Sequence, residues 1–230
     1  MSLAPVCVLA GGLGTRLGAT VADTPKPLLP VAGEPFLLHQ LRLLAAAGAT
    51  RAVLCVGYLG ERIEAALGPE RLGIALSYAY DPPALAGTAG AIRAALPLLG
   101  DRFLVLYGDT YLRVDYAAVD AAHRASGQPA LMTVLRNEGR WDVSNAVYAD
   151  GQVKAYDKHR PTADMRWIDY GLGVLTAQAL DAAPEDPDLA GVYHALARRG
   201  ALAGYKATER FHEIGTPEAL AETEAFLCRR

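Results

Sequence analysis

Short apolar runs alternate with segments of helical periodicity along the first half of this chain, and this alternation restricts the folds that it can adopt. The expected strands are residues 6–9, 51–56, 74–78 and 103–107. The expected helices lie between or after them, at residues 36–47, 59–67, 88–96 and 116–125. Successive parallel strands need a crossover connection, which a helix usually provides. The alternation therefore predicts an α/β fold with a Rossmann-like, doubly wound and mostly parallel sheet.

The second half of the chain is richer in strands. Four strand-like runs follow one another with few helices between them, at residues 130–135, 146–149, 153–156 and 171–175. Asp150-Gly151, between two of these runs, is a strong hairpin signal. Helical patterns return at residues 192–199 and from residue 217 to about residue 228. Because no linker separates the halves and 230 residues can bury one sizeable core, we expect a single domain over residues 1–230 with an inserted strand-rich lobe.

The composition argues against several classes of protein. Lys and Arg total 22 against 25 Asp and Glu, a formal net charge of -3, which a general nucleic-acid binder would not usually carry. No apolar segment reaches membrane-spanning length, and the N-terminus lacks the pattern of a secretory signal. The three cysteines form no metal-binding pattern. We therefore expect a cytoplasmic protein without nucleic-acid or membrane partners, and find no signal of its oligomeric state.

The most informative segment covers residues 9–35 and reads LAGGLGTRLGATVADTPKPLLPVAGEP. An apolar strand ends there in a glycine-rich loop, whose backbone N–H groups can approach an anion closely. Arg16 and Lys26 add positive charge suited to phosphate oxygens. The loop lacks the Gly-Lys-Ser/Thr of a Walker P-loop, and its glycines lack the dinucleotide-binding spacing. Taken by itself, the segment also fits a tight turn followed by a solvated lysine.

The complete run resembles the signature of the sugar-1-phosphate nucleotidyltransferase (NDP-sugar pyrophosphorylase) family, in its compact single-domain form. That signature is Gly-Gly-x-Gly-Thr-Arg-Leu, a short spacer and Pro-Lys-Pro-Leu-Leu-Pro-Val, and eight residues separate Arg16 from Pro25 here. The resemblance implies two catalytic residues, Arg16 to steady the pyrophosphate leaving group and Lys26 to reach the reacting phosphates. It also implies that the loop binds the nucleotide, through Leu9, Ala10, Gly11, Gly12, Gly14 and Thr15.

A magnesium site is the next expectation. Nucleotidyl transfer builds up negative charge, which Mg²⁺ held by carboxylates can neutralise. Asp109 follows the run at residues 103–107 through Gly108, so it lies at the carboxyl end of a strand, where open α/β sheets place ligands. An aspartate that caps the next segment is the alternative. The resemblance favours Asp109 as a catalytic metal ligand. It implies a second ligand in a Phe/Trp-x-Asp-x-Gly-Thr motif, where this chain carries Glu213 in place of aspartate.

Two further segments match family motifs. Gly87 and Thr88 lie in a segment that resembles the family's Leu-Gly-Thr-Ala-Gly nucleotide-binding segment, although Thr88 is also a natural N-cap. In the strand-rich half, Asp157-Lys158-His159 stands where family members have Glu-Lys-Pro, which implies that Lys158 holds the sugar's phosphate. The complete sugar-phosphate site expected in the lobe is Asn145, Asp157, Lys158, Tyr170 and Gly171. Solvated positions on edge strands are the alternative for these residues.

The expected substrates are a nucleoside triphosphate and a sugar 1-phosphate, and the expected products are an NDP-sugar and pyrophosphate. An anionic sugar-phosphate oxygen needs no general base, so positioning and charge stabilisation would carry the catalysis. Overall resemblance to compact family members favours guanylyl transfer to a heptose or mannose 1-phosphate. The alternatives are uridylyl transfer to another sugar 1-phosphate, cytidylyl transfer to a phosphorylated alcohol, and an inactive protein that only binds nucleotide-sugars.

Overall fold

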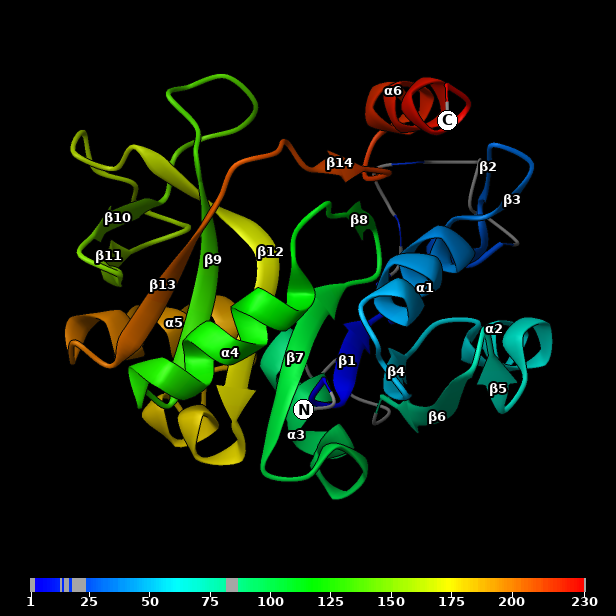
Figure 1. Ribbon diagram of the computed structural model, residues 1–230, viewed down its shortest axis with the longest axis horizontal. Helices are drawn as coiled ribbons and strands as arrows, with labels where there is room; N and C mark the ends of the chain where they lie inside the picture. The colour runs from blue at the N-terminus through cyan, green and yellow to red at the C-terminus, as the bar shows by residue number, and fades with distance from the viewer. Residues whose placement is uncertain (1–2, 13, 15–16, 18–23, 82–86, 230) are drawn as a thin grey trace.

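The computed structural model describes residues 3–12, 14, 17, 24–81 and 87–229. Within these residues, ten strands form one continuous mixed sheet (Figure 1). In the order in which they lie side by side, the strands are β10 (Ala146–Ala149), β11 (Gln152–Tyr156), β13 (Leu202–Ala207), β9 (Ala130–Arg136), β12 (Trp167–Thr176), β7 (Arg102–Tyr107), β1 (Val6–Leu9), β4 (Arg51–Val56), β6 (Ile74–Tyr80) and β5 (Glu70–Arg71).

The strands β7, β1, β4 and β6 are parallel, so their carboxyl ends meet at one edge of the sheet. The helices that connect or follow them are α1 (Phe36–Ala46), α2 (Gly60–Leu67), α3 (Gly87–Leu99) and α4 (Tyr116–Ser126). Alternate residues of β1 face opposite sides, because Val6 and Val8 join one buried cluster and Cys7 joins another.

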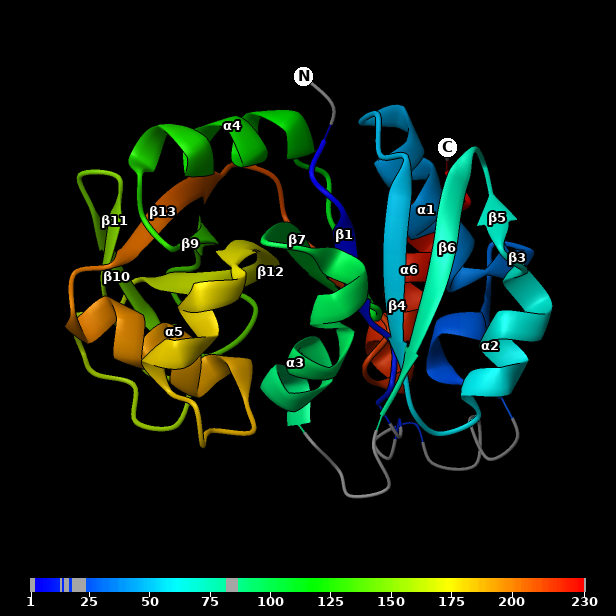
Figure 2. The ribbon, with the colours of Figure 1, turned by 90° about the horizontal axis from the view of Figure 1, so that it is seen from below.

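The two clusters show which helices cover which face of the sheet. The first contains apolar side chains of α1, α2 and α4, and the second contains those of α3 and α5 (Leu189–Arg198). Figure 2 shows α4 on one side of the strands and both α3 and α5 on the other. Helices on both faces of a sheet with a parallel centre confirm the expected doubly wound α/β fold.

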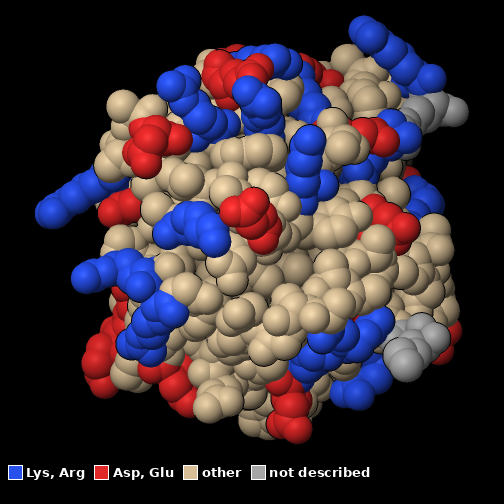
Figure 3. Space-filling view, turned by 60° about the vertical axis from the view of Figure 1, so that its left-hand side comes forward, with Lys and Arg blue, Asp and Glu red and all other residues tan. Residues whose placement is uncertain are grey.

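The strand-rich half extends the same sheet. The strand β12 pairs antiparallel with both β7 and β9, and β13 pairs parallel with β9. Asp150 (φ 52°) and Gly151 (φ 72°) form the predicted hairpin turn between β10 and β11, and positive φ at both positions is typical of a type I′ turn. Figure 3 shows basic and acidic side chains interspersed on the face toward this half.

The end of α3 differs from the sequence-based expectation. The helix was expected to stop before Pro97, but it continues through Pro97 to Leu99. A proline in a helix removes one backbone hydrogen bond and crowds the preceding turn. Here Pro97 lies in the last turn, and Leu99, which is 2% exposed, anchors that turn in the core. Burial of the apolar side chain outweighs the local effect of the proline.

The C-terminal segment packs over the N-terminal region. The short strands β14 (His212–Glu213) and β8 (Thr110–Tyr111) pair antiparallel, and β2 (Pro30–Val31) pairs with β3 (Glu34–Pro35). The C-terminal helix α6 (Pro217–Leu227) lies near β2 (Figure 1), and a third apolar cluster joins them. Short 3-10 turns are η2 (Lys26–Leu28) and η3 (Ala177–Ala182). None of the described helices combines the length and the apolar character needed to cross a membrane.

Candidate functional site

A cavity of about 450 Å³ opens at the carboxyl ends of the central parallel strands. It brings together Lys26 and Asp109, which are far apart in the sequence. The predicted nucleotide-binding residues that line it are Leu9, Ala10, Gly11, Gly12, Gly14, Gly87 and Thr88. Thr15 and Arg16 lie outside the described residues, so their predicted contacts have no structural account. The carboxyl edge of a parallel sheet is where α/β folds usually bind ligands.

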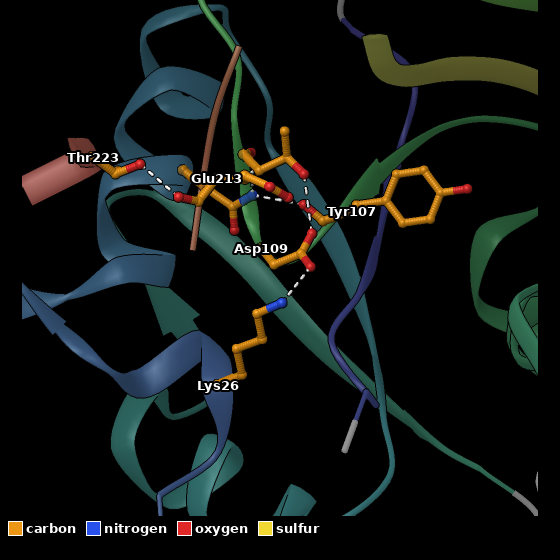
Figure 4. Close-up of polar contacts among 7 residues, drawn as sticks. Lys26, Tyr107, Asp109, Glu213 and Thr223 are labelled. Carbon is orange, nitrogen blue, oxygen red and sulfur yellow. Dashed lines mark hydrogen bonds and ion pairs between the residues drawn. The ribbon is translucent and has the colours of Figure 1, made fainter. Parts of the chain in front are cut away.

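Lys26 and Asp109 form an ion pair in the wall of this cavity (Figure 4). The Lys26 Nζ lies 2.6 Å from Oδ2 of Asp109, and the two side chains are 10% and 30% exposed. Lys26 begins a 3-10 turn directly after Pro25, and the Leu29 N–H donates to the Lys26 carbonyl at the end of this turn. Asp109 follows β7 through Gly108. A mobile ammonium group next to a partly open carboxylate is suited to binding phosphate oxygens and a hard cation.

The backbone of Glu213 lies beside that of Asp109. In the β14–β8 pair, Glu213 is opposite Thr110, and the Ile214 N–H donates to the Asp109 carbonyl at 3.0 Å. The Thr223 hydroxyl of α6 donates to the Glu213 carbonyl at 2.6 Å (Figure 4). Glu213 lines a neighbouring cavity rather than the main one.

The residues that line the main cavity fit a magnesium ion whose ligands would come mostly from substrate phosphates and water. Among the described residues, no cluster of three or more His, Cys, Asp or Glu side chains is arranged to hold a metal. Mg²⁺ commonly binds through only one or two carboxylates together with substrate phosphates and water. Asp109, which opens into the main cavity, supplies one such carboxylate.

A second cavity of about 360 Å³ adjoins the first, and Asp188 lines both. Two of the predicted sugar-phosphate residues, Asp157 and Lys158, line it. The Asp157 carboxylate accepts the backbone N–H groups of Arg160 and His159, each at 2.8 Å. These hydrogen bonds lower the pKa of Asp157 and hold the loop that carries Lys158.

The other predicted sugar-phosphate residues do not line either cavity. The Oδ1 of Asn145 accepts the Asp169 N–H at 2.9 Å, so Asn145 holds β12 in place. The Tyr170 side chain is fully buried and packs edge-on against Phe211. Gly171, with φ of 95°, lies where the pairing of β12 with β9 shifts register. The structure therefore brings the loop residues to the cavity and turns these strand residues toward the sheet.

The chain matches the family model described as "Nucleotidyl transferase" over residues 6–142, which is more than half of its length. This chain belongs to the nucleotidyl transferase family. It is 32% identical to N-acetylmuramate alpha-1-phosphate uridylyltransferase from Neisseria meningitidis serogroup B, over 95% of this chain and 96% of that protein. It is 29% identical to mannose-1-phosphate guanylyltransferase from Mycobacterium tuberculosis, over 96% of this chain and 64% of that protein.

The solved structures show the same fold. A UDP-glucose pyrophosphorylase complexed with UDP-glucose superposes with a TM-score of 0.83 at 15% identity, covering 99% of this chain and 100% of that one. The family model and the Neisseria relative confirm the family indicated by the glycine-rich and Pro-Lys-Pro motifs. Nucleotidyl transfer to a sugar phosphate is the activity that the matches support.

Sequence reasoning missed two acidic residues of this nucleotidyltransferase cavity, Asp81 and Asp188, and Asp188 also lines the second cavity. Asp81 lines the main cavity directly after β6, and burial raises its pKa. A Cβ added to Gly11 would lie 2.7 Å from the Asp81 Oδ2, and one added to Gly57 would lie 2.6 Å from it. Both glycines thus allow the carboxylate to sit between two loops. The signal that could have found Asp81 is its place after a strand, the same signal that indicated Asp109.

Thr88 has a structural role that the sequence did not indicate. It lies in the first turn of α3, and its hydroxyl accepts the Leu189 N–H at 2.8 Å. Thr88 thereby bonds to the N-terminus of α5 instead of serving as the N-cap of its own helix. The Ala89 N–H also donates to the Pro187 carbonyl at 2.8 Å. These bonds join the wall of the main cavity to the segment that carries Asp188.

Proposed function

We propose that this nucleotidyltransferase transfers a nucleoside monophosphate from a nucleoside triphosphate to a sugar 1-phosphate, with Mg²⁺ as cofactor. The observation that carries the proposal is the Lys26–Asp109 pair in the wall of a cavity that the glycine-rich loop also lines. A second, adjoining cavity contains the loop of Lys158. Two connected spaces suit two phosphorylated substrates that must meet at one phosphorus atom.

The reaction is an in-line displacement at the α-phosphorus of the triphosphate. An oxygen of the sugar phosphate forms the new bond, the bond to the β-phosphate oxygen breaks, and pyrophosphate leaves with the electron pair. Lys26 moves from Asp109 to the phosphate oxygens and stabilises the charge that develops on them. Arg16 takes the proposed role of steadying the pyrophosphate. A bound Mg²⁺ would supply charge neutralisation, with Asp109 as its ligand in the main cavity. We propose Glu213, whose backbone pairs with Thr110 beside Asp109, as the second ligand, which requires its side chain to turn from the neighbouring cavity toward Asp109.

The second cavity is the proposed sugar-phosphate site. Lys158 is exposed and lines the cavity, so its ammonium group can reach the phosphate of the sugar. Asp157 holds the loop through two backbone hydrogen bonds and presents its carboxylate edge to a sugar hydroxyl. Asn145, Tyr170 and Gly171 contribute by fixing β12, the strand that carries Asp169.

Asp81 supports guanylyl transfer as the more specific reaction. The strand order places β6 three strand spacings from β7, so the ends of these two strands, which precede Asp81 and Asp109, lie about 14 Å apart. That separation suits the distance from a base to its phosphates. A carboxylate only accepts hydrogen bonds, and guanine presents two adjacent donors, N1–H and N2–H₂, where uracil presents one. Transfer to a heptose or mannose 1-phosphate is the favoured reaction, and uridylyl transfer, as named for the Neisseria relative, is the second candidate.

The test is pyrophosphate release from four nucleoside triphosphates combined with a panel of sugar 1-phosphates in the presence of Mg²⁺. We expect the highest turnover with GTP. Lys26→Ala and Asp109→Ala should each lower turnover by about 100-fold or more, because Lys26 stabilises the charge on the reacting phosphates and Asp109 would hold the metal ion that also does so.

The matched control is Lys154→Ala. Lys154 is an exposed lysine on β11, and its ammonium group donates to the Gln152 side-chain oxygen at 2.7 Å. Its removal should leave turnover unchanged. Near-normal release from the Lys26 and Asp109 variants would overturn the proposed site, and no release with any substrate pair would favour a protein that only binds nucleotide-sugars.

A further inference from the structure

Gln40 is a buried amide on the apolar face of α1, where it contacts the turn that carries Asp109. Gln40 is 1% exposed, and the other buried side chains of α1 are apolar. The Nε2 group donates to the Tyr107 carbonyl and to the Thr110 carbonyl, each at 2.8 Å. Both of its hydrogens are therefore used on one short stretch of backbone.

We infer that Gln40 is a positioning residue that fixes the Gly108–Asp109 turn, and this inference rests on the proposed role of Asp109. The two carbonyls belong to the last residue of β7 and the first residue of β8, so they flank the turn on both sides. A single amide group ties them together. The direction of the Asp109 side chain depends on the backbone between these two bonds.

The remaining bonds to the backbone of the turn come from other backbone groups, whereas Lys26 and the Thr110 hydroxyl bond to the Asp109 side chain. The Gly108 N–H donates to the Leu9 carbonyl at 3.0 Å, and the Ile214 N–H donates to the Asp109 carbonyl at 3.0 Å. The Thr110 hydroxyl donates to the Asp109 Oδ1 at 3.0 Å. Among the described residues, Gln40 is the side chain outside the turn that bonds to its carbonyl groups.

The burial of Gln40 is not explained by packing alone. A leucine would continue the apolar face of α1, whereas a buried amide must satisfy its polar atoms. The Gln40 Oε1 is buried and has no hydrogen-bond partner within the described part of the chain. The amide therefore carries the cost of one unsatisfied buried atom. We take its two donated hydrogen bonds as the role that offsets this cost. Catalytic groups need support of this kind, because a displacement of about 1 Å can reduce the rate about 100-fold.

The experiment compares Gln40→Met with the wild type, because methionine keeps the length and approximate volume of glutamine but cannot donate. The matched control is Thr133→Val, which removes another fully buried donor, the hydroxyl that bonds to the Leu172 carbonyl at 2.6 Å in the neighbouring part of the sheet. We expect kcat to fall about 10- to 100-fold in Gln40→Met. The KM for the sugar phosphate should stay within about 2-fold of wild type, because the second cavity does not contact Gln40. The control should keep its kcat.

A second measurement does not depend on activity. In the protein without metal or substrate, hydrogen exchange at the backbone amides of residues 108–110 should be faster in Gln40→Met than in wild type and unchanged in Thr133→Val. A kcat and an exchange rate equal to those of wild type would overturn the inference. If Gln40→Met does not fold, NMR of the wild type decides instead, since fast exchange of the Gln40 side-chain amide protons would contradict the two bonds. If the wild type releases no pyrophosphate, the proposed function fails, while the exchange data still test the positioning role.

Discussion

At the scale of single residues, the cavity is defined by a few charges whose neighbours are far away in the sequence. Lys26 and Asp109 are 83 positions apart and lie 2.6 Å from each other. Asp81 lines the same cavity, where it sits between the loops of Gly11 and Gly57. The cavity thus has a cation and a carboxylate after β7 and a further carboxylate after β6, and we propose that these groups face the phosphates and the base of one nucleotide.

Asp81→Asn tests the proposed base preference at this scale. An amide can donate as well as accept, so the variant replaces one acceptor by a donor while keeping the size of the side chain. We expect the ratio of kcat/KM for GTP to that for UTP to fall about 5- to 100-fold, the range of one good bidentate base contact. The control is Asp101→Asn, since Asp101 is exposed and lies outside both cavities. An unchanged ratio would assign the base choice to other residues.

At the scale of elements, β12 is the strand that links the sugar-phosphate side to the central sheet. Its pairing with β9 shifts register between Asp169 and Gly173, at the point where Gly171 has positive φ. Asp169 accepts the Gly171 N–H at 2.9 Å within this irregular stretch. Burial raises the pKa of Asp169 to about 6, while the Gly171 N–H and the Lys158 charge act in the opposite direction. The irregular strand thus holds a carboxylate in an environment that favours its protonated form.

The consequence is a pH-dependent contribution of Asp169 to stability. Its folded pKa of about 6 lies above the usual aspartate pKa of 3.8, so the ionised form opposes folding. The wild type therefore loses stability as pH rises through the folded pKa. We expect Asp169→Asn to have a higher free energy of unfolding than wild type above about pH 7, and the difference to vanish below about pH 4. Urea unfolding at several pH values measures this difference in the free energy of unfolding. A difference that does not change with pH would contradict the raised pKa of Asp169.

At the scale of the whole molecule, one sheet runs through both halves of the chain. The β12–β7 ladder, in which Leu172 pairs with Leu106 and Val174 with Leu104, joins the strand-rich half to the parallel centre. The helices α3 and α5 share one apolar cluster across the same boundary. A division between the halves would break this ladder and expose both sides of the cluster.

We therefore expect residues 1–230 to unfold as a single cooperative unit. Trp141 and Trp167 both lie in the second half, so tryptophan fluorescence reports on that half, whereas far-ultraviolet circular dichroism reports on the helices of both. The two probes should give the same midpoint in urea. Two separated transitions would show that the strand-rich half is an independent domain.

The sequence alone was sufficient for features that depend on near neighbours. Helical spacing located α1 and α4 to within a residue at either end, and Asp150-Gly151 identified the hairpin. The glycine-rich and Pro-Lys-Pro motifs indicated the family and selected Lys26. Local periodicity and turn preferences act over a few residues, so they can be read directly from the chain.

Only the tertiary structure decided which distant groups meet. The contacts of Gln40 lie 67 and 70 positions along the chain, and those of Asp81 with the glycine loop depend on the order of β6, β4 and β1. Tyr170 and Asn145, expected at the sugar phosphate, instead fix β12. Strand order and register determine these contacts, and both arise from burial of the whole apolar surface, which no short stretch of sequence contains.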